Sequence, residues 1–108
     1  MNILFVCSQN RLRSPTAENV FSNYPGYSVR SAGLDKSAIV SISTEDIEWS
    51  EIIFVMEQEH KNKLMKRFGK ICSNKKIVVL GIPDEYEYMD PTLINELKDK
   101  TSKYIIGK

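Results

Sequence analysis

The chain has 108 residues, of which 42% are hydrophobic and 27% charged. This length is typical of one domain, and the apolar content excludes collagen-like, low-complexity and disordered sequences. Fifteen basic and fourteen acidic residues give a formal net charge of +1, so neither a broad nucleic-acid-binding surface nor a polybasic membrane patch is expected. We therefore expect a single domain over residues 1–108, in which any anion site is local.

Targeting segments and paired cysteines are not expected either. No apolar run approaches the roughly 20 residues of a bilayer-spanning helix, and the apolar N-terminal stretch has no basic segment before it, unlike a signal peptide. Cys7 and Cys72, the two cysteines of the chain, are expected to stay reduced because an export signal is missing. These features predict a cytoplasmic protein, and we expect it to be a monomer.

Short apolar runs alternate with helical patterns along the chain. Apolar, β-branched runs without polar alternation are typical of strands that are covered on both faces of a parallel sheet. In chain order the pattern predicts a strand at 3–7, a helix at 15–23, a strand at 27–32, a helix at 44–50, a strand at 52–56, a helix at 57–68 closed by Gly69, a strand at 77–80 and a helix at 91–105. With right-handed crossovers this alternation predicts an α/β fold, a three-layer doubly wound sandwich around a four-stranded parallel sheet.

The residues after the first predicted strand have the composition of an anion-binding loop. Ligands of such sheets bind beyond the carboxyl ends of the strands, and there the sequence reads CSQNRLRSP from position 7 to position 15. Loop amides and a helix N-terminus suit a tetrahedral dianion, and the fork of Arg13 can grip two of its oxygens. Ser14 can cap the helix and donate a hydrogen bond to the sulfur of Cys7.

Cys7 has two possible roles. A lone cysteine at a strand end is more often a small buried hydrophobe. Oriented amides and the Arg13 guanidinium, however, favour the thiolate over the thiol. Because Arg13 and Ser14 follow at the spacing that this chemistry needs, the sequence favours a nucleophile.

The segment ILFVCSQNRLRSPTAE at 3–18 resembles the signature of the low-molecular-weight protein tyrosine phosphatase family, which pairs a CxxxxxRS loop with an Asp-Pro near the C-terminus. The resemblance continues in order: Ser31-Ala32-Gly33 resembles the family's SAG turn, 52–56 its third strand, and Asp90-Pro91 its general-acid motif. It implies a phosphatase I-like fold and hydrolysis of phosphomonoesters through a phosphocysteine intermediate. Protein phosphotyrosine is the implied substrate, and no cofactor or metal is implied.

Carried over residue by residue, the resemblance implies that Cys7 is the nucleophile, Arg13 the phosphate clamp and Asp90 the general acid. Asn10 would hold the conformation of the loop, and Ser14 would assist the thiolate. The other loop residues are expected to contact the substrate, namely Ser8, Gln9, Arg11 and Leu12. An aspartate before a proline is also a common helix N-cap, and the two roles are compatible.

Several positions depart from the family's pattern. Gln9 stands where the family usually has glycine, which predicts a different loop shape, and Leu12 replaces a second loop cysteine. Arg11 adds a guanidinium, which disfavours phosphoarginine as a substrate unless it points to solvent. The family's supporting histidine is missing, and His60, on a polar helix, is expected at the surface, which leaves the partner of Asn10 open.

The C-terminal quarter of the chain supplies two aromatic candidates and a basic tail. Tyr86 and Tyr88 are expected to wall the pocket, as aromatic side chains that hold a phenyl ring would. The family's aromatic residues after the Asp-Pro are replaced by Thr92 and Leu93, which weakens the case for phosphotyrosine. Residues 98–108 are expected to form a solvated helix end that frays.

Two other functions remain open. An arsenate reductase would use the same loop on a phosphate-like oxyanion, but thiol exchange needs a resolving cysteine and only Cys72 is available. A phosphate-recognition module would bind a phosphorylated protein, nucleotide or RNA end without turnover, although Cys7 and Asp90 together argue for an enzyme. The expected partner is a phosphorylated protein or a small phosphomonoester, with neither a membrane nor a nucleic acid.

Overall fold

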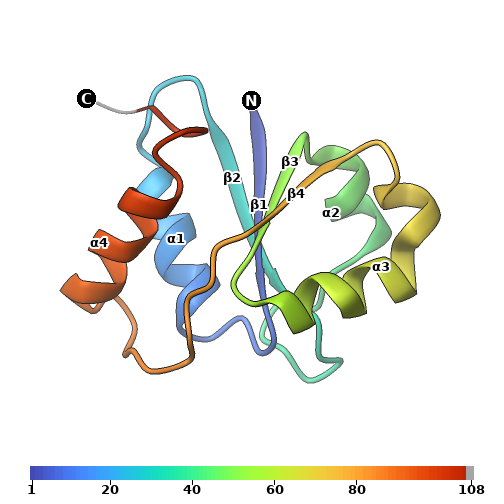
Figure 1. The fold of residues 1–108 in the computed structure, drawn as a ribbon, viewed down its shortest axis with the longest axis horizontal. Coiled ribbons are helices and arrows are strands. Elements are labelled where there is room, and N and C mark those ends of the chain that lie inside the picture. The colour runs from blue at the N-terminus through green and yellow to red at the C-terminus, as the bar shows by residue number, and fades with distance from the viewer. Residues whose placement is uncertain (107–108) are drawn as a thin grey trace.

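The computed structural model describes residues 1–106, in which strands and helices alternate along the chain (Figure 1). The elements are β1 (Asn2–Cys7), α1 (Arg13–Phe21), β2 (Ser28–Gly33), α2 (Thr44–Trp49), β3 (Ile52–Val55), α3 (Gln58–Cys72), β4 (Lys76–Val79) and α4 (Pro91–Lys100). All four strands pair in parallel, in the order β2-β1-β3-β4. The predicted doubly wound sandwich is thereby confirmed. No helix within residues 1–106 is long and apolar enough to cross a lipid bilayer.

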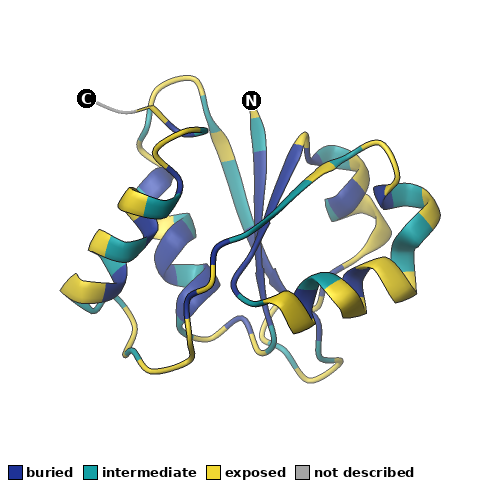
Figure 2. Cartoon of the chain, viewed as in Figure 1, coloured by how far each residue is buried: buried dark blue, intermediate teal, exposed yellow. Residues whose placement is uncertain are grey.

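The two faces of β1 bury different side chains, because successive residues of a strand point to opposite sides of the sheet. Ile3, Phe5 and Cys7 belong to the core beneath α1 and α4, whereas Leu4 and Val6 belong to the core beneath α2 and α3. All five side chains are at most 3% exposed. Burial is concentrated on the strands and on the helix faces turned toward them, as Figure 2 shows. This double coverage is why the strand sequences lack polar alternation.

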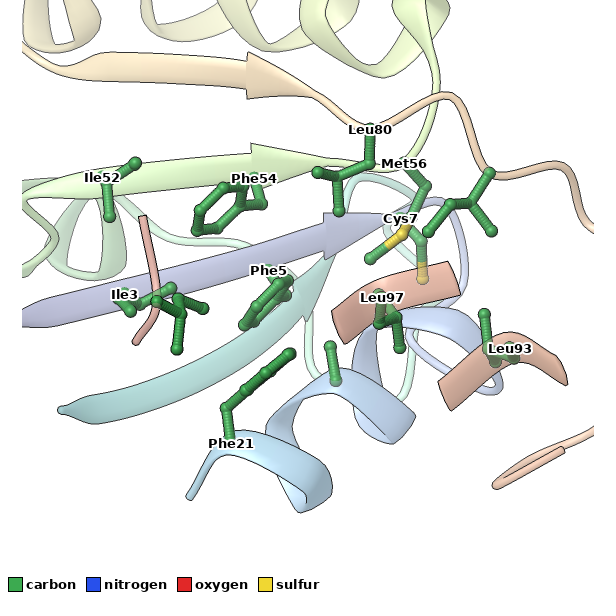
Figure 3. Packing of buried hydrophobic residues seen from close by; sticks show 13 residues of the cluster. Ile3, Phe5, Cys7, Phe21, Ile52, Phe54, Met56, Leu80, Leu93 and Leu97 are labelled. Carbon is green, nitrogen blue, oxygen red and sulfur yellow. The ribbon is translucent and has the colours of Figure 1, made fainter. Parts of the chain in front are cut away.

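Three phenylalanines form the centre of the core beneath α1 and α4 (Figure 3). The ring of Phe5 stacks on Phe21 and on Phe54, with centroids 5.6 and 5.2 Å apart. Cys7 extends this cluster at the C-terminal end of β1. The packed strand end thus gives the sulfur a fixed position at the edge of the sheet.

The third helix is longer than predicted. Gly69 was expected to end it, but α3 continues to Cys72. The backbone of Phe68 leaves the helical region at φ −129° and ψ 24°, and the helix resumes after this kink. The glycine therefore marks a bend, which sequence periodicity does not separate from an end.

The expectation of a fraying C-terminal tail was wrong for the residues that the structure describes. α4 ends at Lys100, after which Thr101 and Ile105 are buried and the ring of Tyr104 packs edge-on against Phe54 with centroids 5.5 Å apart. The amide of Ile106 donates to the hydroxyl of Tyr27 over 3.0 Å. Apolar residues between the lysines hold the tail on the core. Gly107 and Lys108, the end of the predicted segment, lie outside the described residues.

Candidate active site

The loop between β1 and α1 forms a cavity of about 190 Å³ at the C-terminal edge of the sheet. The cavity is lined by Cys7, Ser8, Gln9, Arg11, Leu12, Arg13 and Asp84. Cys7 is 3% exposed, whereas Gln9 and Arg11 are exposed to solvent. The cavity therefore connects solvent to a buried sulfur, as the β1–loop–α1 sequence predicted.

Two hydrogen-bond partners approach the sulfur of Cys7. The backbone N–H of Asn10 donates to Sγ over 3.3 Å, and the hydroxyl oxygen of Ser14 lies 2.9 Å from Sγ. Asn10 and Ser14 are both buried. Donors held in a buried site stabilise a thiolate more than a neutral thiol.

A chain of hydrogen bonds fixes the direction in which Ser14 donates. A carboxylate only accepts, so the hydroxyl of Ser31 donates to Glu18 Oε1 and its oxygen accepts from Asn10 Nδ2 over 3.0 Å. Asn10 Nδ2 also donates to Ser14 Oγ over 2.9 Å. The hydrogen of Ser14 is then directed to Cys7 Sγ. The direction at Ser14 is thus set by the amide nitrogen of Asn10, from which hydrogen bonds run to Cys7 through Ser14 and to Glu18 through Ser31.

This network supplies the partner of Asn10 that the sequence left open. Ser31 lies on β2 beside the loop, and Glu18 lies one helical turn after Ser14 on α1. Residues four apart on a helix share a face, so the spacing of Ser14 and Glu18 was a usable signal. The place of Ser31 depends on the pairing of β1 with β2, and a sequence pattern alone does not contain it.

The start of α1 differs from the prediction. The helix begins at Arg13, and its N-cap residue Leu12 makes no side-chain cap hydrogen bond. The expectation that Ser14 caps this helix was therefore wrong, because its hydroxyl is directed to Cys7. The amides of the first turn remain free to bind an anion at the helix N-terminus.

The loop turns at Asn10 rather than at Gln9. Asn10 has a φ of 54°, in the left-handed region that asparagine tolerates, and Gln9 is not among the positive-φ residues of the described chain. The side chain of Gln9 instead donates to the carboxylate of Asp35. Replacing the family's glycine by glutamine therefore introduces no left-handed strain at that position.

The segment after β2 supports the cavity loop through backbone hydrogen bonds. Leu34, Asp35 and Ile39 donate their N–H groups to the carbonyls of Cys7, Ser8 and Gln9 at 2.9–3.1 Å. Those carbonyls are thereby tied away from the cavity. Within residues 1–106 the loop amides of residues 9, 11 and 12 donate to no protein acceptor, so they are available to an oxyanion.

Gly33 permits this close support. A Cβ atom at Gly33 would lie 2.5 Å from the Cβ of Ala38 and 2.6 Å from the carbonyl oxygen of Ser8. It would also lie 3.0 Å from the amide nitrogen of Asn10. Only glycine lets β2 approach the loop this closely.

Arg13 is held by partners on two other segments. Its Nη1 donates to Glu57 Oε1 over 3.0 Å and to the carbonyl of Ile82 over 2.8 Å, while its Nε lies 3.8 Å from Asp84 Oδ1. The side chain is 5% exposed. Because Nη1 carries the structural contacts, Nε and Nη2 are the atoms that can grip two phosphate oxygens.

His60 contradicts its predicted surface position, since it is completely buried. Its Nδ1 accepts the N–H of Glu57 over 3.0 Å, which places the ring hydrogen on Nε2, 3.0 Å from Ser8 Oγ. Burial lowers the pKa of His60, and the nearby charge of Arg13 lowers it further, against the opposing charges of Glu57 and Glu59. The charged neighbours of His60 in the sequence suggested a surface position. In the structure, the first turn of α3 places His60 against Ser8 of the loop.

The same turn brings together three groups of the kind that ligate metals. Ligand atoms of Glu57, Glu59 and His60 lie within 4.8 Å of one another. Both ring nitrogens of His60 are engaged in hydrogen bonds, and Glu57 is paired with Arg13. His60 and Glu57 therefore serve the loop and the clamp, and Glu59 is exposed.

Neither tyrosine of the predicted aromatic wall is among the residues that line the cavity. Tyr86 packs against the core beneath α1 and α4, and Tyr88 lies in a separate groove along α1, where its hydroxyl accepts from Asn19 over 3.2 Å. The amide of Met89 donates to Thr16 Oγ1 over 3.0 Å. This bond fastens the segment to the flank of α1, away from the cavity.

The residue expected to be the general acid, Asp90, does not line the cavity. Asp90 is the N-cap of α4, and its Oδ1 accepts the N–H of Thr92 over 2.8 Å. It is not among the residues that line the cavity, whereas Asp84 is. Asp84 was not among the predicted site residues, although it follows the last strand at the end of the sheet where ligands bind.

The fold is that of the low-molecular-weight protein tyrosine phosphatases, as comparison with solved structures shows. The structure of such a phosphatase from Streptococcus pyogenes, SP-PTP, aligns over 96% of this chain and 93% of its own with a TM-score of 0.77 and 17% identity. The tyrosine phosphatase Wzb from Escherichia coli K30 in complex with phosphate aligns over 95% and 94% with a TM-score of 0.75 and 20% identity. The YwlE arginine phosphatase from Geobacillus stearothermophilus aligns over 94% and 93% with a TM-score of 0.67 and 24% identity. No protein-family model and no curated protein sequence matches the chain.

Proposed function

We propose that the chain is a cysteine-dependent phosphatase of the protein-tyrosine-phosphatase type, which hydrolyses phosphate monoesters through a phosphocysteine intermediate. The observation that carries the proposal is the surroundings of Cys7. Its sulfur receives hydrogen bonds from Asn10 N–H and Ser14 in a cavity that also contains the Arg13 guanidinium. A nucleophile, an anion clamp and free loop amides thus converge on one small cavity.

In the first step the thiolate of Cys7 attacks phosphorus. The S–P bond forms while the bond from phosphorus to the ester oxygen breaks, and the leaving oxygen takes a proton from a carboxyl group at the cavity. Arg13 and the loop amides hold the three remaining oxygens, where negative charge develops. This step yields the alcohol or phenol and a phosphocysteine.

In the second step water attacks the phosphocysteine. The S–P bond breaks, inorganic phosphate forms, and the carboxylate accepts the proton that water gives up. The leaving group is the Cys7 thiolate, which the hydroxyl of Ser14 stabilises by its hydrogen bond. The sum of the two steps is hydrolysis of a phosphomonoester, with the protein restored.

Proteins phosphorylated on tyrosine are the proposed substrates. Similar structures carry the names of both tyrosine and arginine phosphatases. Arg11 is exposed and is also among the residues that line this cavity, where its guanidinium would repel the cationic side chain of phosphoarginine while tolerating a neutral phenol. A phosphotyrosine ester is therefore favoured over phosphoarginine, a phosphoramidate.

Arsenate reduction through a thiol relay is disfavoured by the place of Cys72. Cys7 belongs to the core beneath α1 and α4, and Cys72 to the core on the opposite side of the sheet. Burial raises the pKa of the Cys72 thiol, against the charge of Lys75, so it is a poor attacking group. Both cysteines are free, which fits the reducing cytoplasm as the proposed compartment.

The test is phosphate release from para-nitrophenyl phosphate and from a phosphotyrosine peptide, with EDTA present, between about pH 5 and 8. Wild-type protein should turn over both, and Cys7→Ala should abolish turnover. Cys7→Ala should still bind inorganic phosphate, because the clamp and the amides remain. A wild-type protein that binds phosphate but releases none from either substrate would contradict the proposal and leave a phosphate-recognition module.

A further inference from the structure

A second cavity adjoins the cavity loop. It has a volume of about 380 Å³, and the segment after β2 and the middle of α3 line it with Leu34, Asp35, Lys36, Lys63, Lys66 and Arg67. The carboxylate of Asp35 accepts from the side chain of Gln9, which itself lines the cavity around Cys7. The hydrogen bond between these two side chains therefore joins the walls of the two cavities.

The second cavity is strongly basic. Four of its six lining side chains are cationic, and all four are exposed. Within residues 1–106, none of these four forms an ion pair with a carboxylate. Asp35 is the acidic residue among the six, and its carboxylate is engaged with Gln9. An anionic group that enters this cavity would therefore meet cations that have no anionic partner of their own.

Backbone contacts fix the second cavity relative to the nucleophile. Leu34 donates its N–H to the carbonyl of Cys7 over 2.9 Å, and its own carbonyl accepts from Arg67 Nη1 over 2.6 Å. Asp35 donates its N–H to the carbonyl of Ser8 over 3.0 Å. A ligand bound to Cys7 therefore has the basic cavity at a set position beside it.

The opposite side of the active-site opening is acidic. Asp84, which lines the cavity around Cys7, is followed by Glu85 and Glu87, and all three side chains are exposed. This segment leads to α4, which covers one face of the sheet, whereas α3 covers the other face (Figure 1). A protein segment that lies across the opening therefore meets negative charge on one side and positive charge on the other.

We infer that the basic cavity binds an acidic segment next to the phosphotyrosine of the substrate protein, and the inference rests on the function proposed above. Unpaired cations attract the carboxylates of aspartate and glutamate, while the acidic segment after β4 repels them and directs them to the α3 side. Such contacts are remote from the reacting atoms and form equally in the ground state and the transition state. They therefore lower KM and leave kcat unchanged.

The test uses three peptides with one phosphotyrosine each. One carries a run of glutamates before the phosphotyrosine, one carries the run after it, and one has glutamines at all of these positions. For the wild-type protein, kcat/KM of the better acidic peptide should exceed that of the glutamine peptide by about tenfold, mainly through KM. Because salt screens exposed charges, this advantage should shrink between about 50 and 300 mM salt.

Two double variants locate the effect. Changing Lys63→Glu and Lys66→Glu together reverses two charges of the cavity and should remove the advantage of the acidic peptide. The matched control changes Lys98→Glu and Lys103→Glu, two exposed positions on α4 and just after it, and alters the net charge equally. Both variants should hydrolyse para-nitrophenyl phosphate at near wild-type rates, because this ester has no flanking residues. That rate also shows that each variant is folded.

The possible failures are distinguishable. The inference is overturned if neither acidic peptide is a better substrate than the glutamine peptide, or if the advantage survives the changes at Lys63 and Lys66. It is also overturned if the control variant loses the advantage equally, which is the effect of net charge alone. Wild-type protein that releases phosphate neither from para-nitrophenyl phosphate nor from any peptide would instead refute the phosphatase function itself.

Discussion

The Nε2 atom of His60 lies 3.0 Å from the hydroxyl oxygen of Ser8. This contact joins the first turn of α3 to the cavity loop, and the ring holds its other nitrogen against the N–H of Glu57. The arrangement requires neutral imidazole, because Nδ1 has to accept while Nε2 donates. Protonation of His60 would therefore break the bond from Glu57.

This requirement predicts a stability that depends on pH. Burial and Arg13 lower the pKa of folded His60 below its ordinary value of 6.5. Between the two values the unfolded chain binds more protons than the folded one, so the free energy of unfolding rises with pH. The contribution of neutral His60 to the free energy of unfolding is complete above about pH 6.5. It is lost as the pH falls toward the lower pKa that His60 has in the folded protein.

Denaturant unfolding of wild type and His60→Gln between about pH 5 and 8 measures this contribution. Since His60 is the single histidine of the chain, the difference in unfolding free energy should shrink as the medium becomes more acidic. A difference that stays constant over the whole range, or grows toward acid, would contradict a buried neutral imidazole.

Arg13→Lys should weaken anion binding and stability together. Lysine has one ammonium group, which cannot bond Glu57 and the Ile82 carbonyl and still grip two phosphate oxygens. We expect at least a tenfold loss of inhibition by inorganic phosphate and a loss of about 1–3 kcal/mol in unfolding free energy. The control is Arg11→Lys, which makes the same change at an exposed position. Equal losses of phosphate inhibition and of stability in the two variants would contradict the assignment of Arg13 as the clamp.

Glu18→Gln should slow the departure of the thiolate. Glutamine can donate as well as accept, so the hydroxyl of Ser31 is no longer fixed as a donor to position 18, and its hold on Asn10 Nδ2, which donates to Ser14, is weakened. A weakening of about 1 kcal/mol at the sulfur lowers kcat roughly fivefold. Burst kinetics should assign the loss to hydrolysis of phosphocysteine. Glu48→Gln, an exposed change on α2, is the matched control, and an identical effect there would exclude a role for the network.

Gly33→Ala tests the close approach of β2 to the loop. Its new methyl group would overlap Ala38 and the Ser8 carbonyl, which should cost about 1–3 kcal/mol of stability and weaken phosphate binding. Gly69→Ala is the comparison, because a Cβ there meets no atom within 4 Å and alanine should stabilise α3 by about 0.5–1 kcal/mol. Thermal unfolding of both variants checks the prediction, and a loop that tolerates Gly33→Ala with full phosphate affinity would refute it.

The order of strands and helices could be read from the sequence, because apolar runs and helical periodicity are local properties. The same holds for the loop around Cys7. Its cysteine, arginine and serine lie within eight consecutive residues, and the strand before and the helix after them place them at the ligand-binding edge of the sheet. The sequence of this short segment is therefore enough to predict the strand, the loop and the helix, and the edge of the sheet at which the loop lies.

The long-range partners of the loop were decided by the tertiary structure. His60 reads as a surface residue among charged neighbours, yet the packing of α3 buries it beneath Ser8. Asp84 and Asp90 are both loop aspartates in the sequence, and only the anchoring of Ile82 and the capping of α4 separate their positions. Distances across the sheet depend on how its layers pack, and that packing sums many weak contacts that no short stretch of sequence contains.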